Sequence, residues 1–193
     1  MIRKGMAALL ALLLFAGCGN TRKEQTDALR SRYRELESWK TTVQLTLPRE
    51  EETAAYTLSL SANGEEVTLT VLSPEELEGV GATLAGENLQ LRFDDLVLDG
   101  GTANETLNGF NAVPFVIETI KTGYLLEEGR EEFDGEERLR LGLEGELNGA
   151  ALHAAVFFGE EEEPLFAEIS ENGKILARME FTDFAFGAIL SVE

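Results

Sequence analysis

Residues 139–181 read LRLGLEGELNGAALHAAVFFGEEEEPLFAEISENGKILARMEF, and apolar residues recur at alternate positions on either side of two Asn-Gly pairs. A period of two is typical of strands with one buried face. Asn-Gly between two such runs is the strongest short-range signal for a β-hairpin. The stretch therefore predicts an antiparallel meander that turns at Asn148-Gly149, at Glu160–Pro164 and at Asn172-Gly173.

The same alternation continues towards the N-terminus, where Asn63-Gly64 marks a third hairpin and residues 73–77 fit a single capped turn. The strands expected in this part are 43–47, 56–60, 67–71, 80–84, 89–93 and 96–98. Proline and the acidic run 50–52 are expected to end the first of them. Three tight hairpins argue against crossover helices, so we expect one sheet of roughly eight to eleven strands, almost all antiparallel.

An N-terminal segment has helical periodicity instead. Leu29, Tyr33 and Leu36 fall at i, i+4 and i+7, which places them on one face of a helix. Either Thr26 or Asp27 can cap its start. The sequence thus predicts a helix from residue 26, directly before the first strand.

A second helix is expected from Pro114 to Thr122, with Gly123 at its end. A loop containing glycine and asparagine, residues 100–109, leads into it, and the acidic stretch 126–137 after it is expected to be an exposed loop or a ragged strand. Residues with helical spacing are expected to face the sheet from this helix: Val113, Val116, Ile117, Ile120 and Tyr124.

These patterns predict a mainly β fold of the α+β class. A single curved antiparallel sheet is expected, with the N-terminal helix and the mid-chain helix on its concave face. Residues 26–193 are expected to form one domain, since the length suits a single core.

The N-terminus has the features of an export signal. Arg3 and Lys4 precede the apolar run 7–15, which is too short to span a membrane and has the length of the apolar region of a signal peptide. The run ends in Phe-Ala-Gly-Cys, which resembles the lipobox of bacterial lipoproteins, where the cysteine is acylated, for example with palmitate. We therefore expect a signal peptide over 1–17, lipidation at Cys18 and a lipidated, flexible tether over 18–25.

This export signal predicts an extracytoplasmic protein that is anchored by its N-terminal lipid to the outer face of a bacterial cell membrane. Cys18 is the only cysteine, so an internal disulfide is excluded. Asp and Glu number 36 against 16 Lys and Arg, and the formal net charge is −20. Nucleic acid and anionic headgroups are repelled by such a domain, which is expected to stay soluble as a monomer.

The residues give little support to catalysis. His153 is the only histidine, and it is expected in mid-strand, pointing away from the apolar face. The chain has no Gly-x-Ser-x-Gly elbow, no glycine-rich phosphate loop, no EF-hand pattern and too few Cys and His for zinc. We expect that the protein is not an enzyme and that it has no cofactor and no metal centre, although loose calcium binding by acidic loops remains open.

Two functions remain open at this point. A curved sheet that its helices fill incompletely leaves an apolar concavity for a hydrophobic ligand, with the second helix and its five inward residues as the binding face or lid. Alternatively, helices and sheet close into a tight core, and the protein binds an extracytoplasmic protein partner through its surface.

The order of elements resembles the LolA/LolB-like superfamily of outer-membrane lipoprotein carriers. The resemblance covers roughly residues 26–187 and rests on the lipobox, a short helix ending between Leu36 and Trp39, the Ser73-Pro74 turn, the mid-chain helix and the segment 164–184. It implies a half-barrel whose concave face holds acyl chains or binds a partner, without catalytic residues. A clostridial germination lipoprotein, GerS, shares the superfamily, which implies the alternative of a scaffold that stabilises or regulates an extracytoplasmic enzyme.

Overall fold

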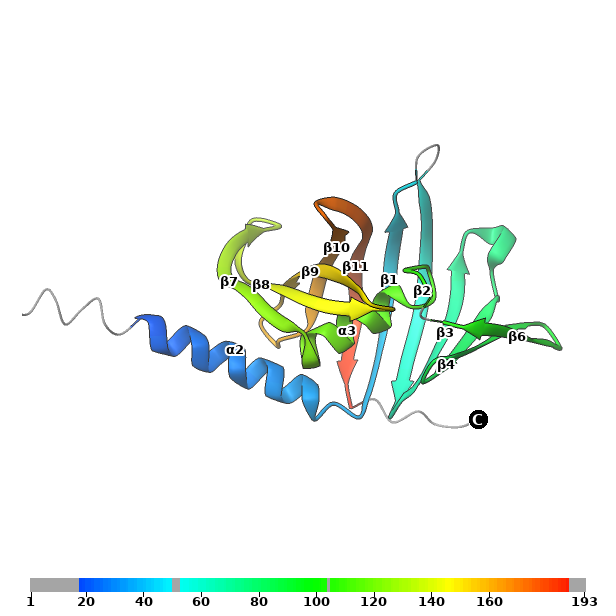
Figure 1. The fold of residues 1–193 in the computed structure, drawn as a ribbon, viewed down its shortest axis with the longest axis horizontal. Coiled ribbons are helices and arrows are strands. Elements are labelled where there is room, and N and C mark those ends of the chain that lie inside the picture. The colour runs from blue at the N-terminus through cyan, green and yellow to red at the C-terminus, as the bar shows by residue number, and fades with distance from the viewer. Residues whose placement is uncertain (1–17, 50–52, 104, 188–193) are drawn as a thin grey trace, which may run out of the picture.

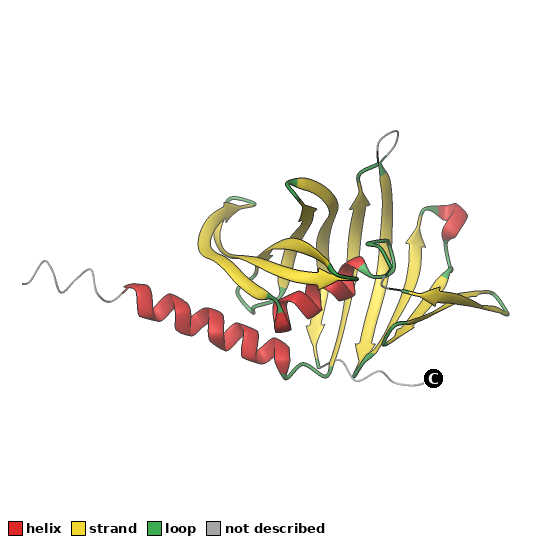
Figure 2. Ribbon diagram, viewed as in Figure 1, coloured by secondary structure: helices red, strands yellow, loops and turns green. Residues whose placement is uncertain are grey.

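The structure is a computed structural model that describes residues 18–49, 53–103 and 105–187. Within these ranges, eleven strands form one antiparallel sheet, accompanied by two α-helices and a 3-10 turn (Figures 1 and 2). The helices are α2 (Cys18–Arg34) and α3 (Ala112–Thr122), and the 3-10 turn is η1 (Glu75–Leu77). The strands are β1 (Ser38–Leu47), β2 (Ala54–Asn63), β3 (Glu66–Ser73), β4 (Gly81–Ala85), β5 (Asn88–Phe93), β6 (Leu96–Thr102), β7 (Tyr124–Phe133), β8 (Glu136–Leu147), β9 (Ala150–Phe158), β10 (Pro164–Glu171) and β11 (Lys174–Phe186).

The strand order is β6-β5-β4-β3-β2-β1-β11-β10-β9-β8-β7. Within each half of the sheet, β1–β6 and β7–β11, strands that follow one another in the chain pair with one another. β1 and β11 join the two halves: Val43 lies opposite Phe181, and Leu45 opposite Met179. The sheet curves around α3, and β6 and β7 are its two edges (Figure 1). The predicted curved antiparallel sheet, with helices on its concave side, is confirmed.

The three Asn-Gly hairpins are also confirmed. Asn148 and Gly149 both have positive φ, at 49° and 78°, and Asn172 and Gly173 repeat this at 50° and 78°. These are the angles that a two-residue type I′ turn requires. In the first hairpin Asn63 is still paired with Glu66, so the loop residues there are Gly64 and Glu65.

The acidic stretch 126–137, expected as an exposed loop or a ragged strand, is not a loop: it belongs to the hairpin of β7 and β8, whose register has one irregularity between Leu125 and Glu127. Its turn is Asp134-Gly135, with φ of 53° and 78°. The missing alternation has a physical cause: β7 is an edge strand and most of its residues are exposed on both faces. Asp-Gly indicates a β-hairpin as strongly as Asn-Gly does, but only between runs of alternating apolar residues, and the strand before this turn is polar.

The first helix is displaced relative to its expected bounds. It begins at Cys18 rather than residue 26, so the stretch 18–25 that was expected to be a flexible tether is helical. Lys23, Glu24 and Gln25 have high helix propensities and continue the helix without a break. The helix ends at Arg34, and Trp39 is a buried residue of β1 that stacks on Phe184 with ring centroids 6.0 Å apart. The expected signal peptide, 1–17, and the acidic run 50–52 lie outside the described residues.

The core lies between the concave face of the sheet and α3. Val113, Val116, Ile117 and Ile120 are each no more than 3% exposed, as expected for the sheet-facing side of this helix. The helix approaches β8 closely because Gly145 has no side chain: a Cβ there would lie 3.0 Å from the Phe115 ring and would also meet Thr119. The position of α3 therefore depends on a glycine in the strand beneath it.

Candidate ligand-binding pocket

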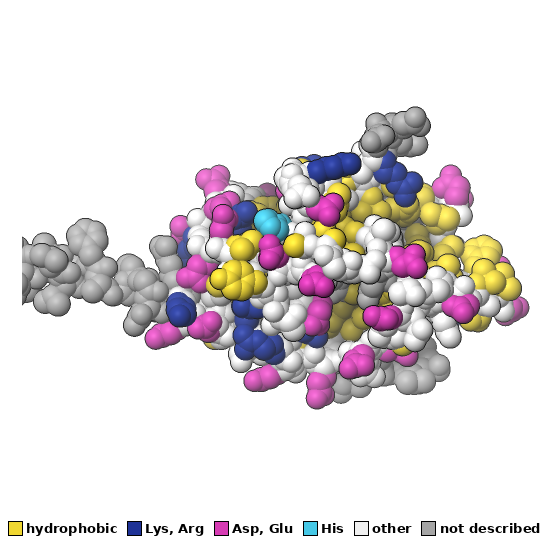
Figure 3. All heavy atoms as spheres, in the orientation of Figure 1, with side chains coloured by type: hydrophobic (Ala, Val, Ile, Leu, Met, Phe, Trp, Pro, Cys, Tyr) yellow, Lys and Arg dark blue, Asp and Glu magenta, His cyan; other side chains and the backbone are white. Residues whose placement is uncertain are grey.

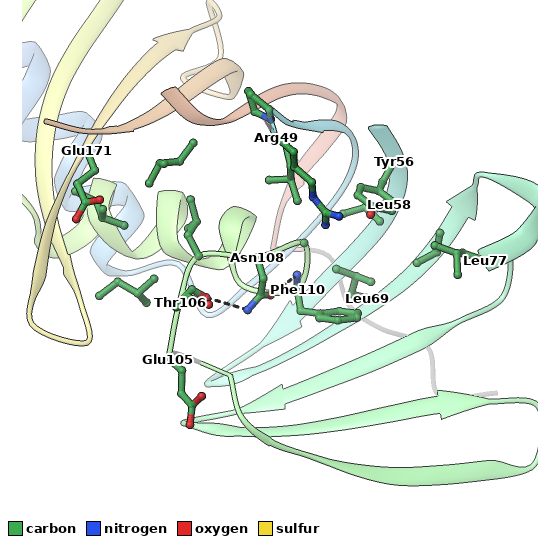
Figure 4. A pocket seen from close by; sticks show the side chains of 18 of the residues that line it. Arg49, Tyr56, Leu58, Leu69, Leu77, Glu105, Thr106, Asn108, Phe110 and Glu171 are labelled. Carbon is green, nitrogen blue, oxygen red and sulfur yellow. Dashed lines mark hydrogen bonds between the residues drawn. The ribbon is translucent and has the colours of Figure 1, made fainter. Parts of the chain in front are cut away.

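A cavity of about 610 Å³ lies on the concave side, between β1–β3 and the loop 105–110 that precedes α3 (Figure 4). This volume lies within the roughly 300–1,000 Å³ that small-ligand sites occupy. Its far wall is formed by the ends of β8 and β9 and by the last two strands. The cavity is the open part of the concavity that the helices leave uncovered.

The floor of the cavity is apolar because the alternation of β2, β3 and β9 turns every second side chain inward. Leu58, Leu69, Val71 and Leu152 line it and are each no more than 5% exposed. Phe110 from the loop lies beside Leu69 (Figure 4). Hydrophobic side chains are visible from outside in the hollow over β2 and β3, so the floor is reachable from the surface (Figure 3).

The loop that forms one wall is fixed by Asn111. This side chain is 2% exposed, and its Nδ2 donates to the carbonyls of Ala103 at 2.7 Å and Thr106 at 2.9 Å. Its Oδ1 accepts the backbone N–H of Asn108 at 2.8 Å. The two arms of the loop are thereby tied to the start of α3, and this wall is preformed.

Two further hydrogen bonds complete the wall. The Oδ1 of Asn108 accepts the backbone N–H of Phe110 at 2.8 Å, which holds the backbone of the loop at Phe110. The Nδ2 of Asn148, in the β8–β9 turn, donates to the Glu105 carbonyl at 3.2 Å. The hairpin turn read from the sequence thus also anchors the loop that covers the cavity.

The polar residues that line the cavity come from the loop wall, which holds Thr106 and Asn108, and from the rim. Arg49 and Tyr56 lie at one side of the opening, and Glu105 and Glu171 lie at others (Figure 4). An apolar floor with polar groups at the opening suits an amphiphile whose chain is buried and whose head stays in water. Within the described ranges, no group of three or more His, Cys, Asp or Glu side chains could hold a metal ion.

His153 lies outside the pocket. It is exposed on the outer face of β9, as the sequence predicted, and its Nε2 lies 3.2 Å from a carboxylate oxygen of Glu144 on the neighbouring strand.

The structure places the five residues of the expected binding face elsewhere. None of Val113, Val116, Ile117, Ile120 and Tyr124 lines the cavity. Ile117 lines a second hollow of about 500 Å³ on the other side of α3, together with Trp39 and Ala62. Ligand binding by these five residues remains a prediction. The loop before the helix, rather than the helix, covers the larger cavity.

The expected place of Tyr124 on the helix face is wrong. It is the first residue of β7 and 71% exposed. The helix ends at Thr122, and the chain continues through Gly123 as a strand. Glycine is needed at this junction because a Cβ there would lie 2.5 Å from the Thr119 carbonyl oxygen. The sequence predicted a loop over residues 100–109 but not that residues 105–110 line the cavity; the available signal was Leu107 and Phe110, two large apolar residues in an otherwise polar turn region.

In the part of the chain that the structure describes, no helix is long and apolar enough to cross a membrane. Cys18 is the first residue of α2. Its lipidation remains a prediction.

No protein-family model and no curated protein matches the sequence. Similarity is found among solved structures. An uncharacterised conserved protein from Thermus thermophilus superposes with a TM-score of 0.51 and 16% identity, over 86% of this chain and 89% of that chain. A domain assigned to outer membrane lipoprotein sorting, from Vibrio parahaemolyticus, superposes with a TM-score of 0.50 and 13% identity, over 86% of this chain and 93% of that chain.

At these identities the similarity concerns the fold alone. A LolA superfamily protein from Nitrosomonas europaea is also similar, with a TM-score of 0.46 and 10% identity, over 85% of this chain and 94% of that chain. The superposition on the lipoprotein-sorting domain extends over most of both chains, and so over most of the open sheet. The chain therefore shares the fold of this lipoprotein-sorting domain, as the resemblance to the LolA/LolB-like carriers implied.

Proposed function

We propose that the protein is an extracytoplasmic lipoprotein that holds a hydrophobic ligand, a lipid or the acyl chains of a lipoprotein, in the pocket between β1–β3 and the loop 105–110. The observation that carries this proposal is the apolar cavity of about 610 Å³ on the concave face. An acyl chain that enters it gains about 0.8 kcal/mol per buried CH₂. The role is binding without catalysis.

Attachment at Cys18 is part of the proposal. Acylation there would place lipid at the first residue of α2, which has 17 residues and is roughly 25 Å long at 1.5 Å per residue. The helix would then act as a stiff spacer between the membrane and the pocket. Such a tether is better suited to a protein that accepts or senses lipid at the membrane than to one that carries lipid by diffusion.

Replacing Cys18 tests the anchor. The wild-type protein is expected in the membrane fraction because two acyl chains hold a protein firmly in a bilayer. Cys18→Ser should release the protein or block its processing. Unchanged fractionation and migration of the Cys18→Ser protein would show that the anchor is not there.

Two alanines at the start of β9 test the pocket. Ala150 lines the cavity, whereas its neighbour Ala151 is exposed on the opposite face of the sheet. We expect saturable uptake of a fluorescent fatty acid by the wild type, with affinity lowered roughly tenfold or more by Ala150→Phe and unchanged by Ala151→Phe. Equal uptake by both variants would contradict the proposed site.

The second candidate function, a scaffold that binds an extracytoplasmic protein, is favoured by a separate observation. The β5–β6 hairpin exposes large apolar side chains that no described element covers. This surface does not depend on the pocket, and the two functions are compatible in one molecule.

A further inference from the structure

The β5–β6 hairpin ends in a protruding apolar tip. Phe93, Leu96, Val97 and Leu98 are 50%, 54%, 60% and 50% exposed. The tip extends beyond the neighbouring strand because β4 begins at Gly81, which pairs with Arg92. Figure 3 shows the hydrophobic side chains gathered at this end of the molecule, and Figure 1 shows β6 at the edge of the sheet.

The two edges of the sheet differ in how they are protected. Edge strands usually carry charged residues or proline that prevent pairing with another chain. The β7 edge follows this rule, with Glu128, Arg130 and Glu132 exposed along it. The β6 edge has neither lysine nor proline, and three consecutive residues, 96–98, are apolar. Among the described residues, Asp99 is the one charged residue of β6, so the β6 edge is the less protected of the two and is the edge where an additional strand can pair.

The register shows which backbone groups such a strand would meet. Phe93 and Leu96 close a two-residue hairpin and therefore exchange hydrogen bonds, and so do Leu91 and Leu98. Val97, which lies between these two pairs, and Asp99, which follows Leu98, turn their N–H and C=O groups away from β5. These two residues offer up to four backbone hydrogen bonds to a segment that lies beside β6.

The charge around the tip indicates the chemistry of that segment. Asp94, Asp95 and Asp99 surround the apolar residues, against Arg92 alone, in a chain of formal net charge −20. A second copy of the chain and an anionic membrane would both be repelled. A segment that alternates apolar residues with lysine or arginine would place its apolar side chains on the tip and its cations beside the three aspartates.

We propose that the β6 edge binds an extended, basic segment of a protein partner, which adds a strand to the sheet alongside Leu96–Asp99. The apolar face of Leu96 and Leu98 supplies the contact area, and the outward backbone of Val97 and Asp99 fixes the register. The site is independent of the ligand pocket.

A labelled peptide of alternating valine and lysine tests this proposal on the full-length protein in nanodiscs of zwitterionic lipid. Fluorescence anisotropy should show saturable binding to the wild type. Val97→Pro removes an outward N–H at a position where an edge strand accepts proline, and should weaken binding about tenfold. The same change on the opposite edge, Glu132→Pro, is the matched control and should leave binding unchanged.

Two altered peptides test the same contacts without a change in the protein. A peptide with glutamate in place of lysine should not bind. A peptide methylated at the alternate backbone nitrogens that would face β6 should not bind either. The proposal is overturned if the lysine peptide does not bind at up to about 1 mM, a concentration that detects weak strand addition, or if Val97→Pro binds it as the wild type does. Two further outcomes would overturn it. Quenching by brominated lipid of a dye attached at Leu98→Cys would show that the tip contacts the membrane. A wild-type dimer that is lost in Val97→Pro would show that the tip binds a second copy of the chain.

Discussion

The Nε of Arg30 donates to the carbonyl oxygen of Ile120 at 3.0 Å, so the first helix caps the end of the second. The guanidinium also donates to the Gly123 carbonyl, and Arg34 reaches the Lys121 carbonyl at 3.3 Å. The last carbonyls of a helix lack partners within the helix and carry partial negative charge, which a cation stabilises. The arginines of α2 therefore fasten it to α3.

Replacing Arg30 should release this contact. Arg30→Met leaves partly buried carbonyls unpaired, and we expect a loss of about 1.5–3 kcal/mol in the free energy of unfolding, measured in urea. Arg178→Met is the control, because Arg178 pairs with Glu168 on the surface, where ion pairs contribute about 0–1 kcal/mol. Equal effects of the two changes would show that α2 is not held by the cap.

Tyr33 links stability to alkaline pH. Burial raises the pKa of the Tyr33 phenol far above its ordinary value of 10.0, although the positive charge of Arg32 acts to lower it. The Tyr33 hydroxyl donates to the Glu162 carbonyl at 2.9 Å. The phenol stays neutral in the folded protein but ionises near pH 10 in the unfolded chain. Its contribution is therefore complete below that pH and decreases as the pH rises above it.

Tyr33→Phe should remove this dependence. Between about pH 9 and 11 the wild type should lose stability more steeply than the variant, at up to about 1.4 kcal/mol per pH unit above pH 10. Urea unfolding over this range measures it, and Tyr124→Phe, at a tyrosine that is 71% exposed, should behave as the wild type. Parallel curves for wild type and Tyr33→Phe would contradict the assignment.

Gly145 sets the distance between α3 and β8. A methyl group there meets Thr119 and lies 3.0 Å from the Phe115 ring, so Gly145→Ala should destabilise the fold by about 1–3 kcal/mol through overpacking. Adding Thr119→Ala should recover part of the loss. Gly129→Ala on β7, where nothing lies within 4 Å, should be nearly neutral in the same thermal unfolding measurement. A neutral Gly145→Ala would mean that the helix can move away at no cost.

Val116→Phe separates the helix from the pocket. Val116 is fully buried and does not line the cavity, so the larger ring should cost about 1–3 kcal/mol while uptake of a fluorescent fatty acid is unchanged. Tolerance of the ring together with lost uptake would instead make the helix the lid of the site. Thermal unfolding and fatty-acid titration of the same sample distinguish these outcomes.

The sequence predicted those parts of the fold that local chemistry determines. Each Asn-Gly turn joins strands that are adjacent in the chain, and the spacing of Val113, Val116, Ile117 and Ile120 predicted their burial against the sheet. The pairing of β1 with β11 and the bond from Arg30 to Ile120 join distant residues, and no turn signal marks either one. Such contacts depend on the tertiary structure and cannot be predicted from local sequence patterns.

The site was harder to predict than the fold for the same reason. An apolar face on a helix shows that the helix is buried, but not whether the space beside it is filled. The pocket depends on Asn111 and Asn108, which turn residues 105–110 into a wall; in the sequence they are typical of any polar connection. Leu107 and Phe110 were the only apolar sign that the loop has a covering role.

The central claim is that a lipid chain lies between β1–β3 and the loop 105–110. A fatty acid with a photoreactive diazirine at the end of its chain tests this most directly, when it is bound to the full-length protein, irradiated and located by peptide mass spectrometry. We predict adducts on residues of the cavity floor, Leu58, Leu69 and Val71, or on Phe110, and their loss in Ala150→Phe but not in Ala151→Phe. Adducts confined to the exposed tip of β5–β6 or to the hollow beside Ile117, or no saturable adduct at all, would contradict the account.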